Sequence, residues 1–337
     1  PTCEPDGLIY TRVVNPGSQI FGERIAEFEG AERAALFASG MAAISTTMWA
    51  LCKPGDTVYF GEPVYGGSDF LFRNILTKWG VTTRTFPLTI SPDELFTTMV
   101  NNRDIGLAVD KPSNVRIVYV ESPANPTLAL ADIPGIVKVV RKYNNKFVND
   151  ESQKVLVVAD NTVLGPVNQQ ALKLGADLAI FSATKMIAGH SDLIAGLVMG
   201  RDELMQSIMD FRTILGTMDD PHVASLLLRS LETLQLRVAG TQENAKRIAQ
   251  FLHEHESVAE VLYPGFHADK EQMQRYRNQC YDQGALMSFR VRGGQEEAYK
   301  VLNALRVVKL AVSLGGTISL AEHPASHTHS DVPVADR

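Results

Sequence analysis

The feature that most constrains the fold of this 337-residue chain is a series of short apolar segments that end in small or polar residues. These segments are rich in valine, isoleucine and aromatic residues, as buried strands are, and occupy residues 56–60, 116–121, 155–160 and 178–182. Segments with the apolar spacing of helices lie around and between them, at residues 22–29, 93–100, 133–143 and 166–174. The alternation predicts parallel crossovers and an α/β sheet covered on both faces.

Polar side chains that can take part in binding or catalysis lie at or just after the ends of three predicted strands. They are Glu121, Asp160 and Lys185. Ligands of open α/β sheets bind beyond the carboxyl ends of the strands. We therefore expect the functional site at that edge.

The pattern changes after about residue 220. Residues 221–254 predict one or two long helices, and a helical segment at 295–305 lies between strand-like runs at 285–291 and 307–314. We expect an α/β domain over residues 15–236 and a smaller, incomplete C-terminal α+β domain over residues 237–337. The polar residues 144–153 predict a surface insertion.

Composition argues against several classes of partner. The net charge of -6, without a lysine- or arginine-rich run, predicts no nucleic-acid partner. No apolar stretch approaches the ~20 residues that cross a bilayer, so we expect no membrane partner. The three cysteines form no C-x-x-C pair and predict neither a disulfide framework nor a zinc site. We expect a reducing, cytoplasmic location.

The strongest single motif is Ser182-Ala183-Thr184-Lys185, directly after a predicted buried strand. Burial disfavours an ammonium ion and lowers its pKa, which makes Lys185 a candidate nucleophilic amine. The hydroxyls of Ser182 and Thr184 can bind a phosphate. This combination suits pyridoxal 5'-phosphate (PLP) held on the lysine as a Schiff base. An isolated lysine would more often be a solvated loop residue.

Two further segments fit the same ligand. Asp160 ends a buried strand, where a carboxylate can keep a pyridinium nitrogen protonated; a helix cap before Thr162 is an equally good interpretation of that residue alone. The segment Ser39-Gly40-Met41 precedes a small-residue helix whose free N–H groups can bind an anion. Such a glycine turn is weak evidence by itself.

Tyr65 and Asn125 are the remaining candidates from the residues alone. Tyr65 is followed by two glycines that leave room for a flat ligand, so stacking and proton transfer are plausible roles. Asn125 lies between two prolines after Glu121 and can reach the cofactor's phenolic oxygen. Half-buried packing and a local turn are the alternative interpretations.

Together these residues resemble the γ-family of PLP enzymes of cysteine and methionine metabolism, which contains methionine γ-lyase, O-acylhomoserine sulfhydrylases, cystathionine γ-synthase and cystathionine lyases. The matching motifs follow the family's order along almost the whole chain. They are Tyr10-Thr11-Arg12, Ser39-Gly40-Met41, Tyr65-Gly66-Gly67, Glu121-Ser122-Pro123-Ala124-Asn125-Pro126, Asp160-Asn161-Thr162, Ser182-Ala183-Thr184-Lys185 and Ser313-Leu314-Gly315-Gly316. The resemblance implies the aspartate aminotransferase-like fold of PLP-dependent transferases, known as fold type I.

The resemblance also implies roles for individual residues. Lys185 would hold PLP and move protons, Asp160 would pair with the pyridine nitrogen, and Tyr65 would stack on the ring. The other implied cofactor-binding residues of the same chain are Ser39, Gly40, Met41, Asn125, Thr162, Ser182 and Thr184. Tyr10 and Arg12 would reach the phosphate of a neighbouring subunit, so that residues 1–14 are the remnant of an arm contacting that subunit. A homotetramer built from two such dimers is implied.

The expected reaction follows from the residues implied to contact the substrate, which are Val312, Ser313, Leu314 and Glu121. Members acting on cystathionine tend to carry glutamate where this chain has Val312, and an apolar side chain suits an uncharged distal group. This favours α,γ-elimination of L-methionine to methanethiol, ammonia and 2-oxobutyrate. Gly67, where methionine γ-lyases commonly carry cysteine, keeps γ-replacement on O-acylhomoserines and cystathionine γ-lyase activity open. A non-catalytic scaffold is a separate alternative, but it would not need Lys185, Asp160 and Tyr65 all intact.

Two other features depart from simple expectations. Residues 322–330 contain three histidines, but a tetrahedral metal site needs a further ligand with supporting contacts, and we expect no metal. The family's carboxylate-binding arginine, in a C-terminal strand of the form Ile/Leu-Arg-Leu/Ile-Ser, has no counterpart before Arg337. We therefore expect the natural chain to continue.

Overall fold

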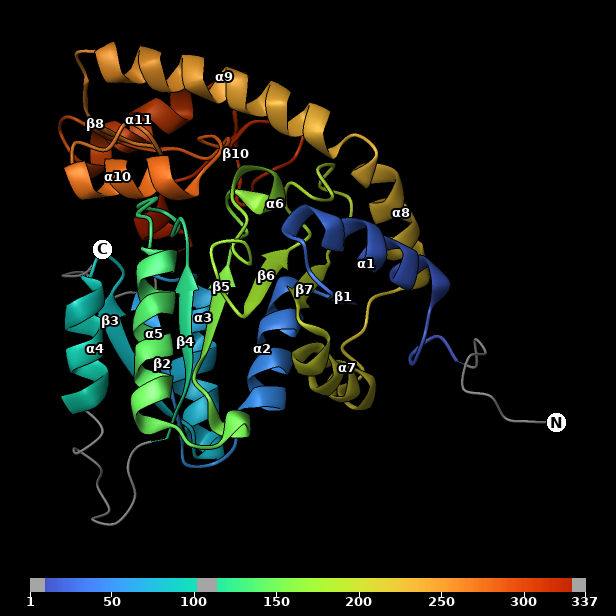
Figure 1. Cartoon of the computed structure of the whole chain (residues 1–337). Coiled ribbons are helices and arrows are strands. Elements are labelled where there is room, and N and C mark those ends of the chain that lie inside the picture. The colour runs from blue at the N-terminus through green and yellow to red at the C-terminus, as the bar shows by residue number, and fades with distance from the viewer. Residues whose placement is uncertain (1–9, 102–113, 329–337) are drawn as a thin grey trace.

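The structure, a computed structural model, describes residues 10–101 and 114–328. A seven-stranded sheet forms the centre of the large domain, in the order β1-β7-β6-β5-β4-β2-β3 (Figure 1). The strands are β1 (Arg33–Phe37), β2 (Asp56–Glu62), β3 (Thr82–Pro87), β4 (Asn114–Glu121), β5 (Leu156–Asp160), β6 (Leu178–Ser182) and β7 (Gly196–Gly200). β7 is antiparallel to both neighbours, whereas the pairs from β3 through β6 are parallel. The predicted mostly parallel sheet is confirmed.

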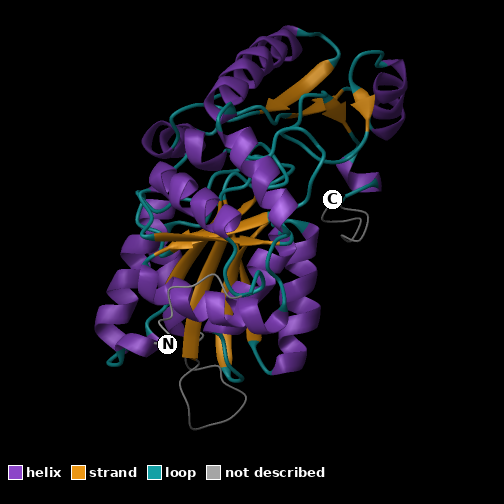
Figure 2. Cartoon of the chain, turned by 90° about the vertical axis from the view of Figure 1, so that its right-hand side faces the viewer, coloured by secondary structure: helices purple, strands orange, loops and turns teal. Residues whose placement is uncertain are grey.

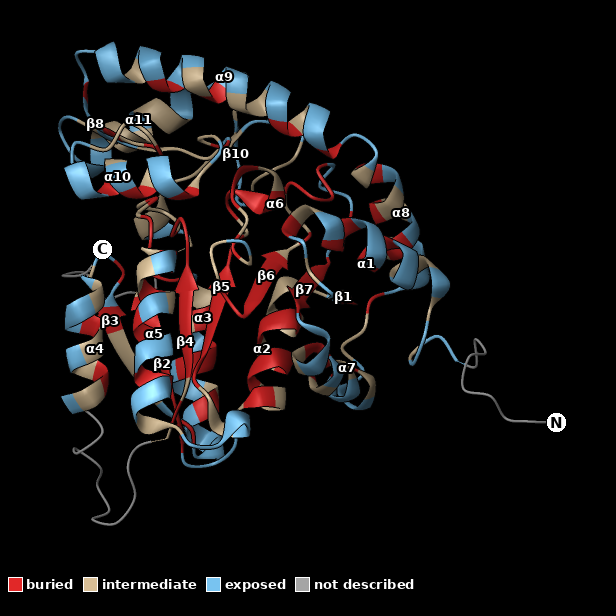
Figure 3. Ribbon diagram, in the orientation of Figure 1, coloured by how far each residue is buried: buried red, intermediate tan, exposed pale blue. Residues whose placement is uncertain are grey.

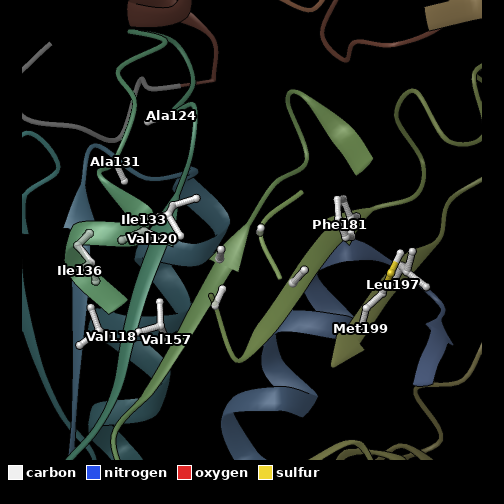
Figure 4. Close-up of a cluster of buried hydrophobic side chains, with 14 of the residues drawn as sticks. Val118, Val120, Ala124, Ala131, Ile133, Ile136, Val157, Phe181, Leu197 and Met199 are labelled. Atoms are coloured by element: carbon white, nitrogen blue, oxygen red, sulfur yellow. The ribbon is translucent and has the colours of Figure 1, made fainter. Parts of the chain in front are cut away.

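Helices cover both faces of this sheet, because successive strand residues point to opposite sides. Val118, Val120 and Val157 pack in one apolar cluster with residues of α1, α4, α5 and α8 (Figure 4). Tyr119 and Val158, one position along, belong to the opposite cluster with α2, η1 and α7. The helices are α1 (Pro16–Glu29), α2 (Gly40–Leu51), the π-helical η1 (Leu71–Ile75), α4 (Pro92–Asn101), α5 (Ile133–Phe147), α7 (Asp202–Leu215) and α8 (Pro221–Leu231). The central strands β2, β4, β5, β6 and β7 are therefore almost entirely buried, the edge strand β3 is largely not, and the outer faces of the helices are exposed (Figure 3).

One predicted helix is wrong over most of its length. Residues 166–174 were expected to be helical, but α6 (Gly165–Asn168) ends after one turn. Gln169 is extended and forms an isolated bridge with Cys280, and its carbonyl accepts a hydrogen bond from the Asn161 side chain at 2.7 Å. These long-range contacts compete successfully with the helical pattern.

The predicted insertion is also only partly correct. α5 continues to Phe147, and Asn144 is buried because its side chain exchanges two hydrogen bonds with the backbone of Val155. Only the residues after α5, with the short 3-10 helix η3 (Glu151–Gln153), form a connection to β5. Asn144 thus belongs to the core of the helix–strand contact.

A smaller α+β unit lies beyond the sheet (Figure 2). Its elements are α9 (Leu234–Glu254), α10 (Lys270–Gln279), α11 (Gln295–Ala304), the antiparallel pair β8 (Val258–Leu262) and β9 (Ser288–Val291), and the parallel pair β10 (Lys309–Leu310) and β11 (Leu320–Ala321). The predicted strands at 285–291 and 307–314 are shorter than expected. The expected domain boundary after residue 236 falls in the first turn of α9, a helix continuous into the small unit. No helix in the described ranges is long and apolar enough to cross a membrane.

Helix α10 joins the small unit to the large domain through buried polar side chains. Gln272 exchanges two hydrogen bonds with the backbone of Leu130, at 2.7 and 3.1 Å. Arg275 donates to the carbonyls of Leu130 at 2.9 Å and Thr89 at 3.0 Å. These bonds satisfy backbone groups that burial would otherwise leave unpaired.

Candidate active site

The carboxyl ends of β4, β5 and β6 bring the expected polar residues to one edge of the sheet. Glu121 and Asp160 are the last residues of β4 and β5 and face each other in register. Ser182 ends β6, and Lys185 follows in a turn. The backbone amide of Lys185 donates to the Ser182 carbonyl at 3.1 Å. Adjacent parallel strands thus place the residues of the two carboxylates side by side, and Lys185 lies in the turn after the next strand of the sheet.

Asp160 is a buried carboxylate whose described hydrogen bonds come from uncharged donors. Oδ2 accepts from the Tyr119 hydroxyl at 3.0 Å, and Oδ1 accepts from the Thr162 amide and hydroxyl at 3.0 and 2.6 Å. Burial raises the pKa of the carboxyl, which the hydrogen bonds from Thr162 oppose. No ion pair to Asp160 is found in the described residues, so its charge lacks a cationic partner.

The Tyr119 contact was missed by the sequence reasoning. Tyr119 precedes Glu121 by two residues, so both side chains project from the same face of β4. Burial, with the nearby Asp160 charge, raises the pKa of its hydroxyl well above the ordinary value. Tyr119 therefore stays protonated and keeps donating to Asp160. The two-residue period within a strand ending in glutamate could have identified it.

Glu121 orients the two turns that follow β2 and β4. Its Oε2 accepts the amide N–H of Tyr65 at 2.7 Å, and its Oε1 accepts that of Asn125 at 3.0 Å. Burial and the neighbouring Asp160 raise the pKa of Glu121 to about 8. Both oxygens are therefore engaged with backbone, and the expected role of Glu121 in substrate binding stays a prediction.

Lys185 is held against the loop that contains Ser313. Its Nζ donates to Ser313 Oγ at 3.0 Å, and burial lowers the pKa of the ammonium group. Ser313 has a positive φ of 98°, unusual for serine, and Gly315 lies so close that a Cβ there would be 2.4 Å from the Met186 amide nitrogen. The loop thus packs directly on the lysine turn. A lysine with a lowered pKa is suited to act as a nucleophile or base.

The N-terminus of α2 lies beside the end of β6. Ser39 caps the helix by accepting the Ala42 amide at 3.0 Å, and the helix geometry leaves the N–H groups of Gly40 and Met41 without partners within the helix. A Cβ on Gly40 would lie 3.0 Å from the Ser182 Cβ. This close approach brings free amides, the positive helix end and the Ser182 hydroxyl together, which is the donor set that a phosphate requires.

The remaining expected cofactor residues differ in the hydrogen bonds that their side chains make. Thr162 links two of them, since its hydroxyl donates to Asp160 and accepts the Ser182 amide at 2.8 Å. The Thr184 hydroxyl instead bonds both the carbonyl and the amide of Ala195, at 3.1 and 3.0 Å. Asn125 is half-buried, and no hydrogen bond of its side-chain carboxamide is described.

Tyr65 is 48% exposed as a whole residue and lies close to Gly67, a glycine that admits no side chain. A Cβ on Gly67 would lie 2.7 Å from the Tyr65 ring and 2.9 Å from Met41 Sδ. The exposed ring is therefore available to a flat ligand above the α2 terminus.

The expected substrate-binding residues near Ser313 and the N-terminal residues Tyr10 and Arg12 lie in different environments. Val312 is 53% exposed and directly precedes Ser313, and Leu314 is half-buried. Arg12 donates to the Thr213 carbonyl at 2.8 Å and lies over the Tyr10 ring. Residues 1–9 of the expected arm and His329 lie outside the described residues.

The residues at this edge fit PLP by their chemistry. Asp160 is an uncompensated buried carboxylate suited to a protonated ring nitrogen. The α2 terminus and Ser182 suit the phosphate, and Lys185 supplies an amine whose neutral form burial favours. Tyr65 offers a ring face.

Comparison with known proteins gives a consistent result. A family profile described as "Cys/Met metabolism PLP-dependent enzyme" matches residues 2–337. The chain is 37% identical over 336 residues to L-methionine gamma-lyase of Fusobacterium nucleatum, covering 99% of this chain and 79% of the relative. It is 36% identical to the cystathionine gamma-synthase/O-acetylhomoserine (thiol)-lyase of Bacillus subtilis, covering 98% and 78%. A solved structure of cystathionine gamma synthase from Xanthomonas oryzae pv. oryzae, in complex with aminoacrylate and cysteine, superimposes with a TM-score of 0.87 at 34% identity, covering 98% and 81%.

Proposed function

Because the chain belongs to the Cys/Met metabolism PLP-dependent enzymes, and is thus a PLP-dependent lyase or γ-replacement enzyme, we propose that it catalyses α,γ-elimination of L-methionine to methanethiol, ammonia and 2-oxobutyrate. The observation that carries the choice of substrate is the exposed, apolar Val312 beside Ser313, the residue that accepts the Lys185 hydrogen bond. An apolar side chain there favours an uncharged thioether over the distal ammonium of cystathionine.

The residues divide the proton transfers among them. When bound, PLP supplies the electron sink that stabilises negative charge at the substrate carbons. Lys185, whose neutral form burial favours, would take the proton from Cα, pass it on to the bound cofactor, and only then take a second proton from Cβ. Asp160 keeps the proton on the ring nitrogen, and Tyr65 donates a proton to the departing γ-sulfur. Glu121 acts through the amides of Tyr65 and Asn125, which it orients.

The assembly belongs to the same proposal. A homotetramer of two dimers would bring Tyr10 and Arg12 of one subunit to the phosphate of another, and the 60% exposure of Tyr10 supports this arrangement. A cytoplasmic location also stays a prediction. The residue assignments and the domain limits at 14 and 236 are part of the proposal.

Steady-state release of 2-oxobutyrate tests the function. The PLP-loaded protein is given L-methionine or L-cystathionine at matched concentrations. Release from methionine at least about tenfold faster supports the proposed substrate, since a misplaced charge at such a pocket costs at least ~1.4 kcal/mol. Faster turnover of cystathionine would contradict it.

One alternative has its own observation. Gly67 stands where the methionine γ-lyases of the family commonly carry cysteine, and the Bacillus subtilis relative carries the name of a γ-replacement enzyme. Consumption of O-acetylhomoserine with sulfide, with no 2-oxobutyrate from methionine, would favour γ-replacement.

A further inference from the structure

One arginine of α9 binds the turn that carries Lys185. Arg237 Nη1 donates to the Met186 carbonyl at 2.7 Å, and Nη2 donates to the Ile187 carbonyl at 3.1 Å. These carbonyls belong to the two residues that directly follow the lysine. Nη2 also donates to the Ser230 carbonyl at 2.8 Å, at the end of α8. A single guanidinium therefore fixes the lysine turn to the α8–α9 junction.

The turn is shaped to admit this guanidinium. A Cβ on Gly189 would lie 1.7 Å from Arg237 Nη1, so only glycine leaves room for it. Gly315, on the loop that contains Ser313, packs against the backbone of Lys185 and Met186 in this turn. The peptides after the lysine are thus bound by Arg237 and contacted by the loop that contains Ser313.

The N–H groups of Arg237 donate their described hydrogen bonds to uncharged oxygens. Its Nε donates to the Thr233 hydroxyl at 3.1 Å, and no ion pair involves Arg237 in the described ranges. A planar fork with five donors can bind several carbonyls at fixed angles, which the three rotating donors of lysine cannot reproduce. The contact therefore fixes direction more than it neutralises charge.

We propose that Arg237 is a positioning residue that sets the direction in which Lys185 leaves the end of β6. This inference rests on the proposed role of Lys185 as the reacting amine, but not on the identity of the substrate. It assigns the start of α9, and with it the small C-terminal unit, a part in aligning the amine.

The test compares R237K and R237Q with R247Q. Arg247 lies on the same helix, is 75% exposed and pairs with Glu243, so R247Q is the matched control. The readouts are the pH midpoint of the visible absorbance of the PLP-loaded protein, kcat and KM separately, and Tm. We expect both Arg237 variants to shift the midpoint and to lose about 10- to 100-fold in kcat with little change in KM, because misplacement by ~1 Å costs that much. R247Q should resemble the wild type.

Lower Tm with an unchanged midpoint and unchanged kcat would reduce Arg237 to a structural residue and overturn the proposal. If R237Q does not fold, R237K decides, since lysine keeps the positive charge but not the planar fork of donors. An absorbance shift in a protein that leaves methionine unconverted would support this inference and reject only the proposed substrate.

Discussion

Burial favours the neutral form of each ionisable residue at or just after the ends of β4, β5 and β6. It raises the pKa of Glu121 and Asp160 and lowers that of Lys185, so each shift favours the neutral form. The neutral amine, which burial of Lys185 favours, can accept a proton from carbon. A cationic ring nitrogen would reverse the effect on Asp160, because an opposite charge favours the carboxylate.

The same effect operates far from the site, on Glu29 at the end of α1. Its carboxylate accepts the Leu172 amide at 3.0 Å, and burial raises its pKa from 4.5 to about 7. The folded-state pKa lies above the unfolded value, so the stabilising contribution is complete below pH 4.5 and is lost as pH rises through 7.

Replacing Glu29 with glutamine should remove this loss, since glutamine does not ionise. We expect E29Q to be more stable than the wild type at pH 8 by about 3 kcal/mol at most, and to differ least near pH 4.5. Urea unfolding at pH 4.5, 6 and 8 measures the difference. A constant difference across this range would contradict the assignment.

Among single residues, sequence reasoning succeeded where a side chain follows a strand end and failed where the contact is distant in sequence. Glu121 and Asp160 could be placed because strand ends in a parallel sheet share an edge. The Arg237 contact with Met186 spans 51 positions, and no local pattern encodes it. Only the folded chain brings α9 onto the lysine turn.

Among elements, the four predicted strands are present because their apolar runs fill both faces of the sheet. β1, β3 and β7 were missed. β1 begins with two half-buried residues, β7 begins and ends with glycine, and β3 has polar residues with only one buried position. Pairing with neighbours, more than local pattern, stabilises such strands. The lost helix at 170–174 has the same cause, because the Gln169 bridge replaces helical bonds.

The docking of α10 can be tested through Arg275. R275M leaves the carbonyl of Thr89 without its described donor and removes one of the two side-chain donors to the carbonyl of Leu130, and such a loss costs about 1–3 kcal/mol per group left unpaired. We expect lower stability in urea and faster hydrogen exchange around residues 130–133. R277M, an exposed arginine of the same helix, is the control. Equal stability of the two variants would show that α10 does not depend on these bonds.

For the whole molecule, the proposed assembly predicts complementation between subunits. K185A lacks the reacting amine, and R12A lacks the arginine expected to reach a neighbour's phosphate. Each variant alone should be nearly inactive, whereas mixed dimers contain one site with both native residues. Unfolding and refolding the two together should restore roughly a quarter of the activity, as random pairing predicts. A mixture as inactive as its components would contradict shared sites.

The central claim, that Lys185 moves protons at Cα and Cβ, is tested most directly with L-norleucine in D2O. Norleucine matches methionine in shape but has no sulfur leaving group, so exchange is separated from elimination. Proton NMR should show loss of the Cα and Cβ signals with the PLP-loaded wild type and with K173A, an exposed-lysine control. K185A should show no exchange on that timescale. Exchange by K185A at the wild-type rate would contradict the claim.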